Sequence, residues 1–241
     1  MPNLRMLATL PTRNTRYRSP TVKPAWYKAR QRSITPAQKA AERTLWPLFG
    51  LAFAHDQVID LDAAFNRPSA QNILEIGCGA GEALLALAES RKDANFMGVD
   101  WYRSGLATCC MELQARELSN VRLARADAFT LLERGLPARP LFDEVLIYFP
   151  DPWRGSEERR MVRSEVVESI GKRMRPAGVL HVATDVEGYP EQVRDVMDAL
   201  PEWRTVSCED RFRPSTRYER EGLEAGRQVV DLCFSYEGCD V

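Results

Sequence analysis

The chain contains 241 residues, of which 44% are hydrophobic and 28% charged, and its formal net charge is −1. This composition is typical of a folded protein with one α/β domain and extensions, and it excludes a disordered chain. No apolar run reaches the roughly 18 residues that a membrane-spanning helix needs, and no apolar signal core follows the N-terminus. We therefore expect a cytoplasmic protein without a membrane partner.

The cysteines and histidines offer little material for a metal centre. Only two histidines occur, His55 and His181, and none of the cysteines forms a C-x-x-C pair. We expect buried, reduced thiols and no bound metal. The oligomeric state stays open, with a monomer favoured. The six cysteines are Cys78, Cys109, Cys110, Cys208, Cys233 and Cys239.

The N-terminal segment is strongly basic. Residues 1–50 hold ten Lys and Arg against one Glu, so this segment carries +9 and the rest of the chain −10. Such asymmetry favours contact with a polyanion, and Tyr17, Trp26 and Tyr27 supply rings that can stack on bases. The alternative is a solvated tail without a partner. We divide the chain into a basic N-terminal arm, residues 1–33, and a folded domain, residues 34–241.

The folded domain begins with a helix and continues with alternating strands and helices. Thr35-Pro36 reads as an N-cap followed by the first helical residue, and residues 37–49 continue that helix. Strands that alternate with helices predict a Rossmann-like, doubly wound α/β fold with a mostly parallel sheet and ligands at its carboxyl edge. Seven strands are expected, over residues 72–76, 96–99, 121–123, 143–149, 179–183, 204–207 and 229–235. Further helices are expected over residues 83–88, 104–118, 129–134, 157–174 and 189–200, with a turn at 176–178.

A glycine-rich turn follows the first of these strands. Its glycines are Gly77, Gly79 and Gly81, preceded by Glu75, in a spacing that differs from the G-x-G-x-x-G of dinucleotide folds. A carboxylate beside the turn repels a pyrophosphate and attracts a cation. S-adenosylmethionine is such a cation, and the pattern resembles motif I of Rossmann-like methyltransferases. A nucleotide cofactor or a merely structural turn are the alternatives.

Two more carboxylates end the next two strands. Asp100 is placed to accept hydrogen bonds from both ribose hydroxyls, and Asp127 from the adenine amino group. The alternative for each is a helix N-cap. Together with Glu75 they place three acids at three consecutive strand ends, which favours a shared cofactor site.

The fourth strand ends in a proline-rich loop, Pro150-Asp151-Pro152-Trp153. Each proline fixes its own φ and restricts its predecessor, so the Asp151 carboxylate is held in place. The loop resembles the Asp/Asn-Pro-Pro-aromatic loop of methyltransferases that act on base nitrogens. A rigid surface turn is the alternative.

Several segments together resemble the bacterial tRNA (guanine-N7-)-methyltransferase family. They are Phe149 to Trp153, Leu180 to Asp185 with Tyr189, Arg213 to Gly222, and Val230 to Phe234. Arg32-Ser33 and Leu45-Trp46-Pro47 are also similar to the N-terminal region of that family. The resemblance extends from about residue 30 to 236. It implies transfer of a methyl group from S-adenosylmethionine to N7 of a guanine in tRNA, at position 46 of the variable loop.

The resemblance also implies roles for individual residues. Asp151 is the candidate catalytic residue. N7 carries a lone pair and no proton, so the reaction needs positioning and charge stabilisation rather than a general base. The cofactor residues implied are Glu75, Gly77, Gly79, Gly81, Asp100, Asp127 and Asp151. The substrate residues implied are Asp185, Thr216, Arg217, Tyr218 and Glu219.

The chain departs from the family pattern after Trp153. The family has a basic run there with a substrate-binding lysine, whereas this chain is shorter and has Gly155 at the lysine's place. Arg154, Arg159 and Arg160 are the candidate substitutes. Two alternatives follow from this departure: a methyltransferase of the same fold that acts on another RNA base, and a catalytically weak relative that binds RNA.

Overall fold

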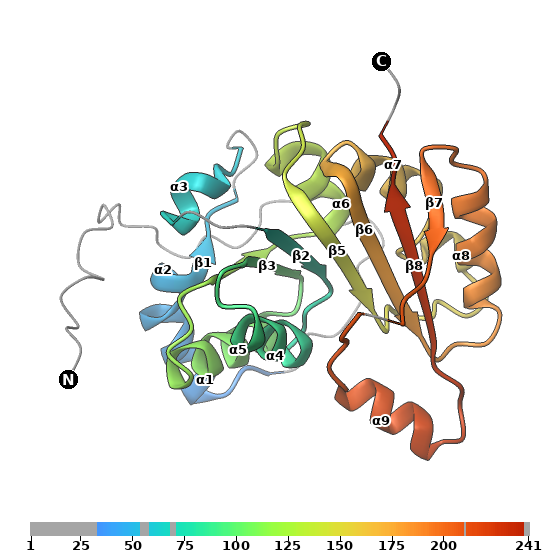
Figure 1. Cartoon of the computed structure of the whole chain (residues 1–241). Coiled ribbons are helices and arrows are strands. Elements are labelled where there is room, and N and C mark those ends of the chain that lie inside the picture. Colours follow the sequence, from blue (N-terminus) through green and yellow to red (C-terminus); the bar gives the residue numbers. More distant parts are fainter. Residues whose placement is uncertain (1–32, 54–57, 68–70, 210, 239–241) are drawn as a thin grey trace.

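Eight strands of the described residues form one twisted sheet (Figure 1). The computed structural model describes residues 33–53, 58–67, 71–209 and 211–238, so the basic arm lies outside it apart from Ser33. The strands are β1 (Gly50–Leu51), β2 (Asn72–Ile76), β3 (Asn95–Asp100), β4 (Val121–Arg125), β5 (Phe142–Tyr148), β6 (Met174–Thr184), β7 (Trp203–Val206) and β8 (Val230–Tyr236). The helices are α1 (Pro36–Thr44), α2 (Trp46–Phe49), α3 (Leu61–Phe65), α4 (Glu82–Ser90), α5 (Arg103–Ala115), α6 (Ala128–Thr130), α7 (Ser164–Gly171), α8 (Tyr189–Asp198) and α9 (Arg217–Glu224).

The strand order is β1-β4-β3-β2-β5-β6-β8-β7, and the prediction of a mostly parallel α/β sheet is confirmed. Pairs from β1 to β6 are parallel, whereas β8 runs antiparallel to β6 and β7. The prediction of seven strands is wrong by one, because β1 adds an edge strand beside β4. A two-residue strand shows no alternation of apolar and polar residues, so the sequence carries no signal for it.

The core has two layers, one on each face of the sheet. Along β5 the side chains alternate: Val145 and Ile147 pack on the face of α7 and α8, whereas Leu146 and Tyr148 pack on the face of α4 and α5. This period of two is what a pleated strand dictates. Because helices cover both faces, β2 is buried along its whole length and reads as a continuous apolar run with one acid.

The start of the domain follows its capping signal. Thr35 Oγ1 accepts from the N–H of Gln38 at 3.2 Å, and Gln38 Oε1 accepts from the N–H of Thr35 at 2.9 Å, which is a capping box. The helix predicted through residue 49 is divided into α1 and α2 at Leu45, next to Pro47. The missing N–H of proline explains the division.

Two predicted elements have different bounds in the structure. The helix expected over 157–174 is a short 3-10 turn, Glu157–Arg159, and then α7, which begins only at Ser164. The turn expected at 176–178 lies within β6, because an irregularity in its pairing with β5, between Phe142 and Glu144, accommodates these residues. Helix α9 was not predicted, since most of its side chains are polar or charged and exposed.

The expectation that all cysteines are reduced is wrong for one pair. Cys208 and Cys233 form a disulfide, with their Cα atoms 5.6 Å apart. Cys233 pairs with Val206 across β7 and β8, so the chain after β7 brings Cys208 within bridging distance. The sequence separation of 25 residues gave no motif that signals this pairing. Cys78, Cys109 and Cys110 are free and buried as expected, and Cys239 lies outside the described residues.

Among the helices of the described ranges, none combines the length and apolar character that crossing a bilayer requires.

We predict that Cys208→Ser lowers the free energy of unfolding by about 3 kcal/mol, because a cross-link across this loop length restricts the unfolded chain. Urea unfolding measures the change. A thiol reductant should lower the stability of the wild type by the same amount and leave that of Cys208→Ser unchanged. Equal stability of the wild type with and without reductant would show that the two thiols are not bonded in solution.

Candidate active site at the carboxyl edge of the sheet

The glycine turn joins β2 to α4 at the carboxyl edge of the sheet. Gly77, Gly79 and Gly81 all have positive φ, of 82°, 55° and 86°, which side-chain-bearing residues rarely adopt. A Cβ at Gly81 would lie 2.5 Å from Cys109 Sγ, so this glycine also allows α4 to pack on α5. At Gly77 and Gly79 a Cβ would meet no described atom within 4 Å, so space for a ligand lies against the backbone there.

Glu75 brings a buried carboxyl group to the end of β2. Its residue is only 4% exposed, and Oε2 has no hydrogen-bond partner among the described residues. Burial, with a smaller contribution from the charge of Asp100, raises the pKa of Glu75 to about 8. A buried carboxyl without a partner is costly, and a cationic ligand in the adjacent space removes that cost.

Asp100 ties the end of β3 to the glycine turn. Its Oδ2 accepts from the N–H of Gly79 at 2.7 Å, and its Oδ1 accepts from the N–H of Tyr102 at 2.6 Å. The pKa of Asp100 is raised overall. Burial is the largest cause and the charge of Asp151 adds to it, whereas these hydrogen bonds partly offset both. Each carboxylate oxygen has a second lone pair, so Asp100 keeps acceptor capacity for a ligand.

Asp127 is the N-cap of α6. Its Oδ1 accepts from the N–H of Thr130 at 2.8 Å and from the Thr130 hydroxyl at 2.7 Å. The alternative weighed from the sequence, a helix cap, is therefore what this carboxylate does in the structure. Oδ2 takes no part in the cap, so a contact with adenine stays a prediction for that oxygen.

The loop that carries Asp151 is strained on both sides. Phe149 and Trp153 have positive φ, of 49° and 40°, in a region that costs a residue with a side chain about 1–3 kcal/mol. Such strain gathers at functional sites, where the surrounding structure enforces it. Partial burial raises the pKa of Asp151, and its charge acts on Asp100. The Asp151 loop therefore brings a carboxylate close to the cofactor side of the site.

The arginines after Trp153 divide into structural and exposed ones. Arg160 is buried, donates to the carbonyl of Pro152 at 2.8 Å and to Gln192 at 2.6 Å, and so fastens the Asp151 loop to α8. Arg159 lies over the ring of Trp153, 5.1 Å from its centroid. Arg154 is exposed and has no ion pair with the described residues. Among the three arginines it alone therefore has a guanidinium available to a ligand beside Gly155, where the family pattern has a lysine.

Helix α9 lies beyond the carboxyl ends of β5 and β6, on the same edge as the glycine turn (Figure 1). It packs against Asp185, since a Cβ at Gly222 would lie 2.6 Å from Asp185 Oδ2. Arg227 donates to that same oxygen at 2.7 Å. Thr216 caps the helix by accepting from the N–H of Glu219. The substrate residues expected from the sequence thus meet at one place.

These expected substrate residues point in two directions. Thr216 is buried and Glu219 is half-buried, whereas Arg217 and Tyr218 are exposed on the outer surface of α9. The guanidinium of Arg217 lies over the Tyr218 ring, 5.0 Å from its centroid. The first pair is turned toward the protein, and the second pair presents an arginine, which also pairs with Glu221, and an aromatic ring to the outside.

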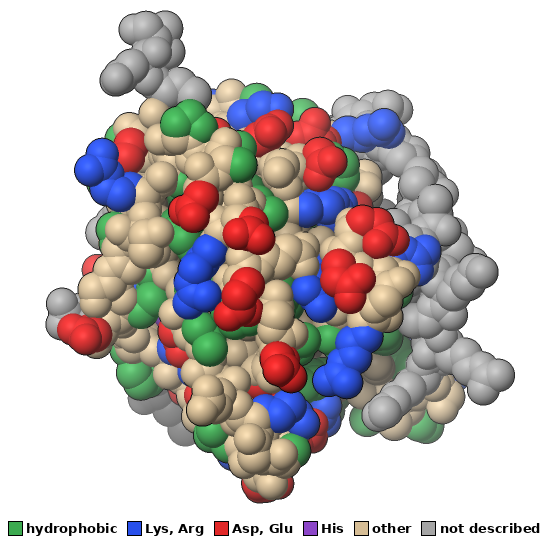
Figure 2. Space-filling model, turned by 90° about the vertical axis from the view of Figure 1, so that its right-hand side faces the viewer, with side chains coloured by type: hydrophobic (Ala, Val, Ile, Leu, Met, Phe, Trp, Pro, Cys, Tyr) green, Lys and Arg blue, Asp and Glu red, His purple; other side chains and the backbone are tan. Residues whose placement is uncertain are grey.

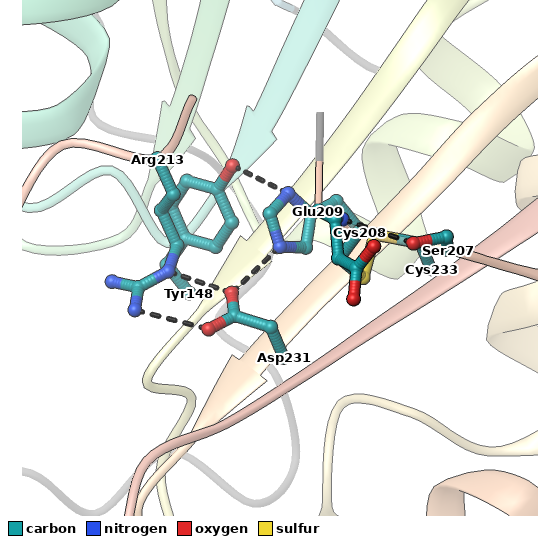
Figure 3. Close-up of a disulfide and its surroundings, with 8 residues drawn as sticks. Tyr148, Ser207, Cys208, Glu209, Arg213, Asp231 and Cys233 are labelled. Atoms are coloured by element: carbon teal, nitrogen blue, oxygen red, sulfur yellow. Dashed lines mark hydrogen bonds and ion pairs between the residues drawn. A yellow bond between two sulfur atoms is a disulfide. The ribbon is translucent and has the colours of Figure 1, made fainter. Parts of the chain in front are cut away.

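A chain of partly buried polar contacts connects α9 to the sheet, and Figure 3 shows its part from Arg213 through Asp231 to Tyr148. Arg213 donates to Glu219 at 2.6 Å and to Asp231 at 2.7 Å, and Asp231 bonds His181 Nε2 at 2.7 Å. The other His181 nitrogen meets the Tyr148 hydroxyl at 3.1 Å. Both nitrogens of His181 are therefore occupied, as in a core histidine with satisfied hydrogen bonds. Burial raises the pKa of Asp231, but its hydrogen bonds from His181 and Arg213 outweigh burial and lower the pKa to about 2.

Arg213 and Glu82 have structural roles that the sequence did not predict. Arg213 begins the quoted segment Arg213 to Gly222, so its position in that motif was the available signal. Glu82 accepts a hydrogen bond from the N–H of Arg217, 135 residues later, and no local pattern announces such a contact. No local pattern announces the disulfide near His181 either, and the loop that it closes, residues 208–233, contains Arg213.

One group of residues has the spacing of metal ligands: His181, Cys208 and Cys233 have ligand atoms within 4.8 Å of one another. The two sulfur atoms are bonded to each other and both histidine nitrogens have partners. This cluster is therefore occupied by its own internal bonds.

The face formed by α8 and β7 lies far from the glycine turn in the strand order. Figure 2 shows acidic and basic side chains interspersed on it. On α8 the exposed charges are Glu191, Arg194, Asp195 and Asp198. Mixed charge of this kind does not form a continuous basic surface. The exposed arginines Arg217, Arg220 and Arg227 lie on or just after α9, where each pairs with a carboxylate and where Glu221 and Glu224 are exposed beside them.

Comparison with known proteins agrees with this architecture. A family model described as "Putative methyltransferase" matches residues 69–232. A solved structure, that of the antibiotic-resistance methyltransferase Kmr, aligns with a TM-score of 0.54 over 79% of this chain and 96% of that chain, at 17% identity, so it shows a shared fold.

Two curated relatives are more similar in sequence, and both are named tRNA (guanine-N(7)-)-methyltransferase. The protein from Nitrosococcus oceani is 37% identical, over 85% of this chain and 87% of its own length. The protein from Leifsonia xyli is 39% identical, over 89% of this chain and 96% of its own length. With the glycine turn, the Asp151 loop and α9 assembled at one edge of a methyltransferase fold, the chain belongs to the tRNA (guanine-N(7)-)-methyltransferase family.

Proposed function

We propose that this protein transfers a methyl group from S-adenosylmethionine to N7 of a guanine in tRNA, at position 46 of the variable loop. The observation that carries the proposal is a single edge of the sheet, where the buried Glu75 carboxyl, with its Oε2 unpartnered among the described residues, and the glycine turn lie on the same edge as the Asp151 loop and α9. Membership of the family supports the same activity.

The residues at the glycine turn fit S-adenosylmethionine. The turn leaves open space beside Gly77 and Gly79, and the acids around it suit a ligand that is cationic and has no phosphate. Glu75 offers its free oxygen, Asp100 its remaining lone pairs to hydroxyls, and Asp127 its Oδ2 to an amino group. When bound, the cofactor supplies a methyl group activated by a sulfonium.

The nucleophile needs orientation rather than deprotonation, because N7 of guanine has a free lone pair. Methylation leaves the base cationic. A carboxylate held rigidly beside the base stabilises that charge as it develops, and Asp151 is the group suited to this role. The positive φ values of Phe149 and Trp153 and the bond from Arg160 hold the loop in place before substrate binds.

The guanine is held by the groups around the N-terminus of α9. Asp185 and Glu219 are carboxylates, so they accept hydrogen bonds from N1–H and the 2-amino group of guanine and leave N7 exposed. The hydrogen bond from Arg213 contributes most to lowering the pKa of Glu219. This carboxylate therefore stays ionised and can act as an acceptor. Arg217, Arg220, Arg227 and the basic arm meet tRNA phosphates.

The test is an assay of the purified protein with labelled S-adenosylmethionine and unmodified tRNA. The proposal expects label at N7 of one guanine in the variable loop, with tRNA affinity that falls steeply as salt rises. Label at another base would favour the alternative that the Gly155 departure raises. Cofactor binding without transfer to any tRNA would favour a binding relative, and no binding of the cofactor would overturn the proposal.

We predict that Asp151→Asn lowers kcat at least about 100-fold, since it removes the charge that stabilises the cationic product while keeping the shape of the side chain. Single-turnover methylation measures the effect, and the melting temperature should stay within about 2 °C. Glu158→Gln, an exposed carboxylate in the next turn, is the matched control and should leave kcat unchanged. Similar losses in both variants would contradict a specific role for Asp151.

We also predict that cofactor binding releases up to about one proton from Glu75 at pH 7. The free carboxyl has a pKa of about 8 and is mostly protonated at this pH, whereas a bound cation favours its ionised form. Affinity should therefore rise as pH increases toward 8. Calorimetry in two buffers with different ionisation enthalpies counts the proton, and Glu75→Gln should release none. An equal count in both proteins would exclude Glu75 as the source.

A further inference from the structure

The N-terminus of α9 is joined to the helix that follows the glycine turn. Glu82, the first residue of α4, accepts a hydrogen bond from the backbone N–H of Arg217, the first residue of α9. Its other carboxylate oxygen lies 3.6 Å from Nη2 of Arg220, one turn farther along α9. One side chain therefore receives both a backbone donor and a charged donor from the same helix.

This contact has a clear physical basis. The first N–H groups of a helix lack partners within the helix, and the helix dipole makes its N-terminus favourable for a negative charge. Thr216 satisfies the N–H of Glu219, and Glu82 satisfies that of Arg217. The Glu82 carboxylate thus completes the cap of α9 from a segment 135 residues away in the sequence.

The other contacts of α9 are also mainly polar. Arg213 holds Glu219 from the sheet side, Gly222 rests against Asp185, and Arg227, just beyond the helix, donates to Asp185. Leu223 and Tyr218, its largest apolar side chains, are more than half exposed, so hydrophobic burial contributes little to holding it. Polar contacts at its N-terminus therefore decide where Thr216 and Glu219 stand relative to the glycine turn.

We propose that Glu82 is a positioning residue, which sets the orientation of α9 and hence of the guanosine-binding groups relative to the cofactor turn. This inference rests on the proposed role of α9 in substrate binding. It assigns no chemistry to Glu82, which acts through Thr216 and Glu219.

The first test compares Glu82→Ala with Glu89→Ala. Glu89 lies on the same helix, is exposed to a similar extent (44% against 43%) and has its own interhelical ion pair, with Arg116 at 3.2 Å, away from α9. We expect Glu82→Ala to lower kcat/KM for tRNA about tenfold, the lower end for a hydrogen bond to a charged group, because its carboxylate is partly exposed. The Kd for S-adenosylmethionine and the melting temperature should match those of Glu89→Ala.

Conservative substitution separates positioning from a general loss of stability. Glu82→Gln keeps an oxygen that accepts from the Arg217 N–H and loses the charge, so it should recover at least half of the lost kcat/KM on a logarithmic scale. Equal activities of Glu82→Ala and Glu82→Gln, both at the wild-type level, would overturn the proposal.

A second pair of variants tests the backbone hydrogen bond itself. Arg217→Pro removes the N–H at the first position of a helix, where proline is tolerated, and Thr216 already has the extended conformation that precedes proline. Arg217→Ala removes the same side chain and keeps the N–H. The proline variant should have a lower kcat/KM than the alanine variant by about the factor for Glu82→Ala, and adding Glu82→Ala to it should have little further effect.

Hydrogen exchange distinguishes a failure of this inference from a failure of the proposed function. Amides of 214–224 should exchange faster in Glu82→Ala than in Glu89→Ala, whether or not tRNA is methylated. Unchanged exchange with wild-type activity would refute positioning by Glu82 and leave the proposed function intact. Faster exchange in a protein that methylates no guanine would uphold the structural link and refute the proposed function.

Discussion

The hydrogen bond from the N–H of Gly79 to the carboxylate of Asp100 holds the candidate site together. It connects the glycine turn to the end of β3, and it keeps the turn in a conformation that only glycines adopt readily. The same bond places Asp100 near the buried Glu75, whose pKa its charge helps to raise. The arrangement gathers negative charge in a partly buried place, which is unfavourable for the free protein and favourable for a cationic ligand.

The part of the site proposed to bind substrate is organised by a different principle. Helix α9 exposes its largest apolar side chains, so buried polar contacts hold it in place of a hydrophobic core. Arg213 is central, because it bonds Glu219 on α9 and Asp231 on β8 and lies 5.4 Å from the centroid of the Phe149 ring. The helix and the start of the Asp151 loop therefore share one anchor, and a shift of either one disturbs the other.

The segment after Trp153 departs from the family pattern, yet the Asp151 loop before it is still held in place. Arg160 donates hydrogen bonds to both Pro152 and Gln192, so it has a structural role rather than that of a phosphate ligand. Gly155 has a φ of 72° and no side chain to reach a substrate. The charge that the family pattern places at this position is therefore absent from position 155 of this chain.

The sequence by itself determined the α/β class, nearly all strands of the sheet, the glycine turn, the Asp151 loop and the N-cap of α1, because each depends on contacts within a few residues or on a short apolar run bounded by turn residues. It could not predict β1, the true extent of β6 and α7, or α9, because neighbours in space decide these. Tertiary structure alone brought Cys208 to Cys233, Arg213 to Asp231 and Glu82 to α9. Such contacts join residues far apart in the chain, and only the folded sheet sets the distances between them.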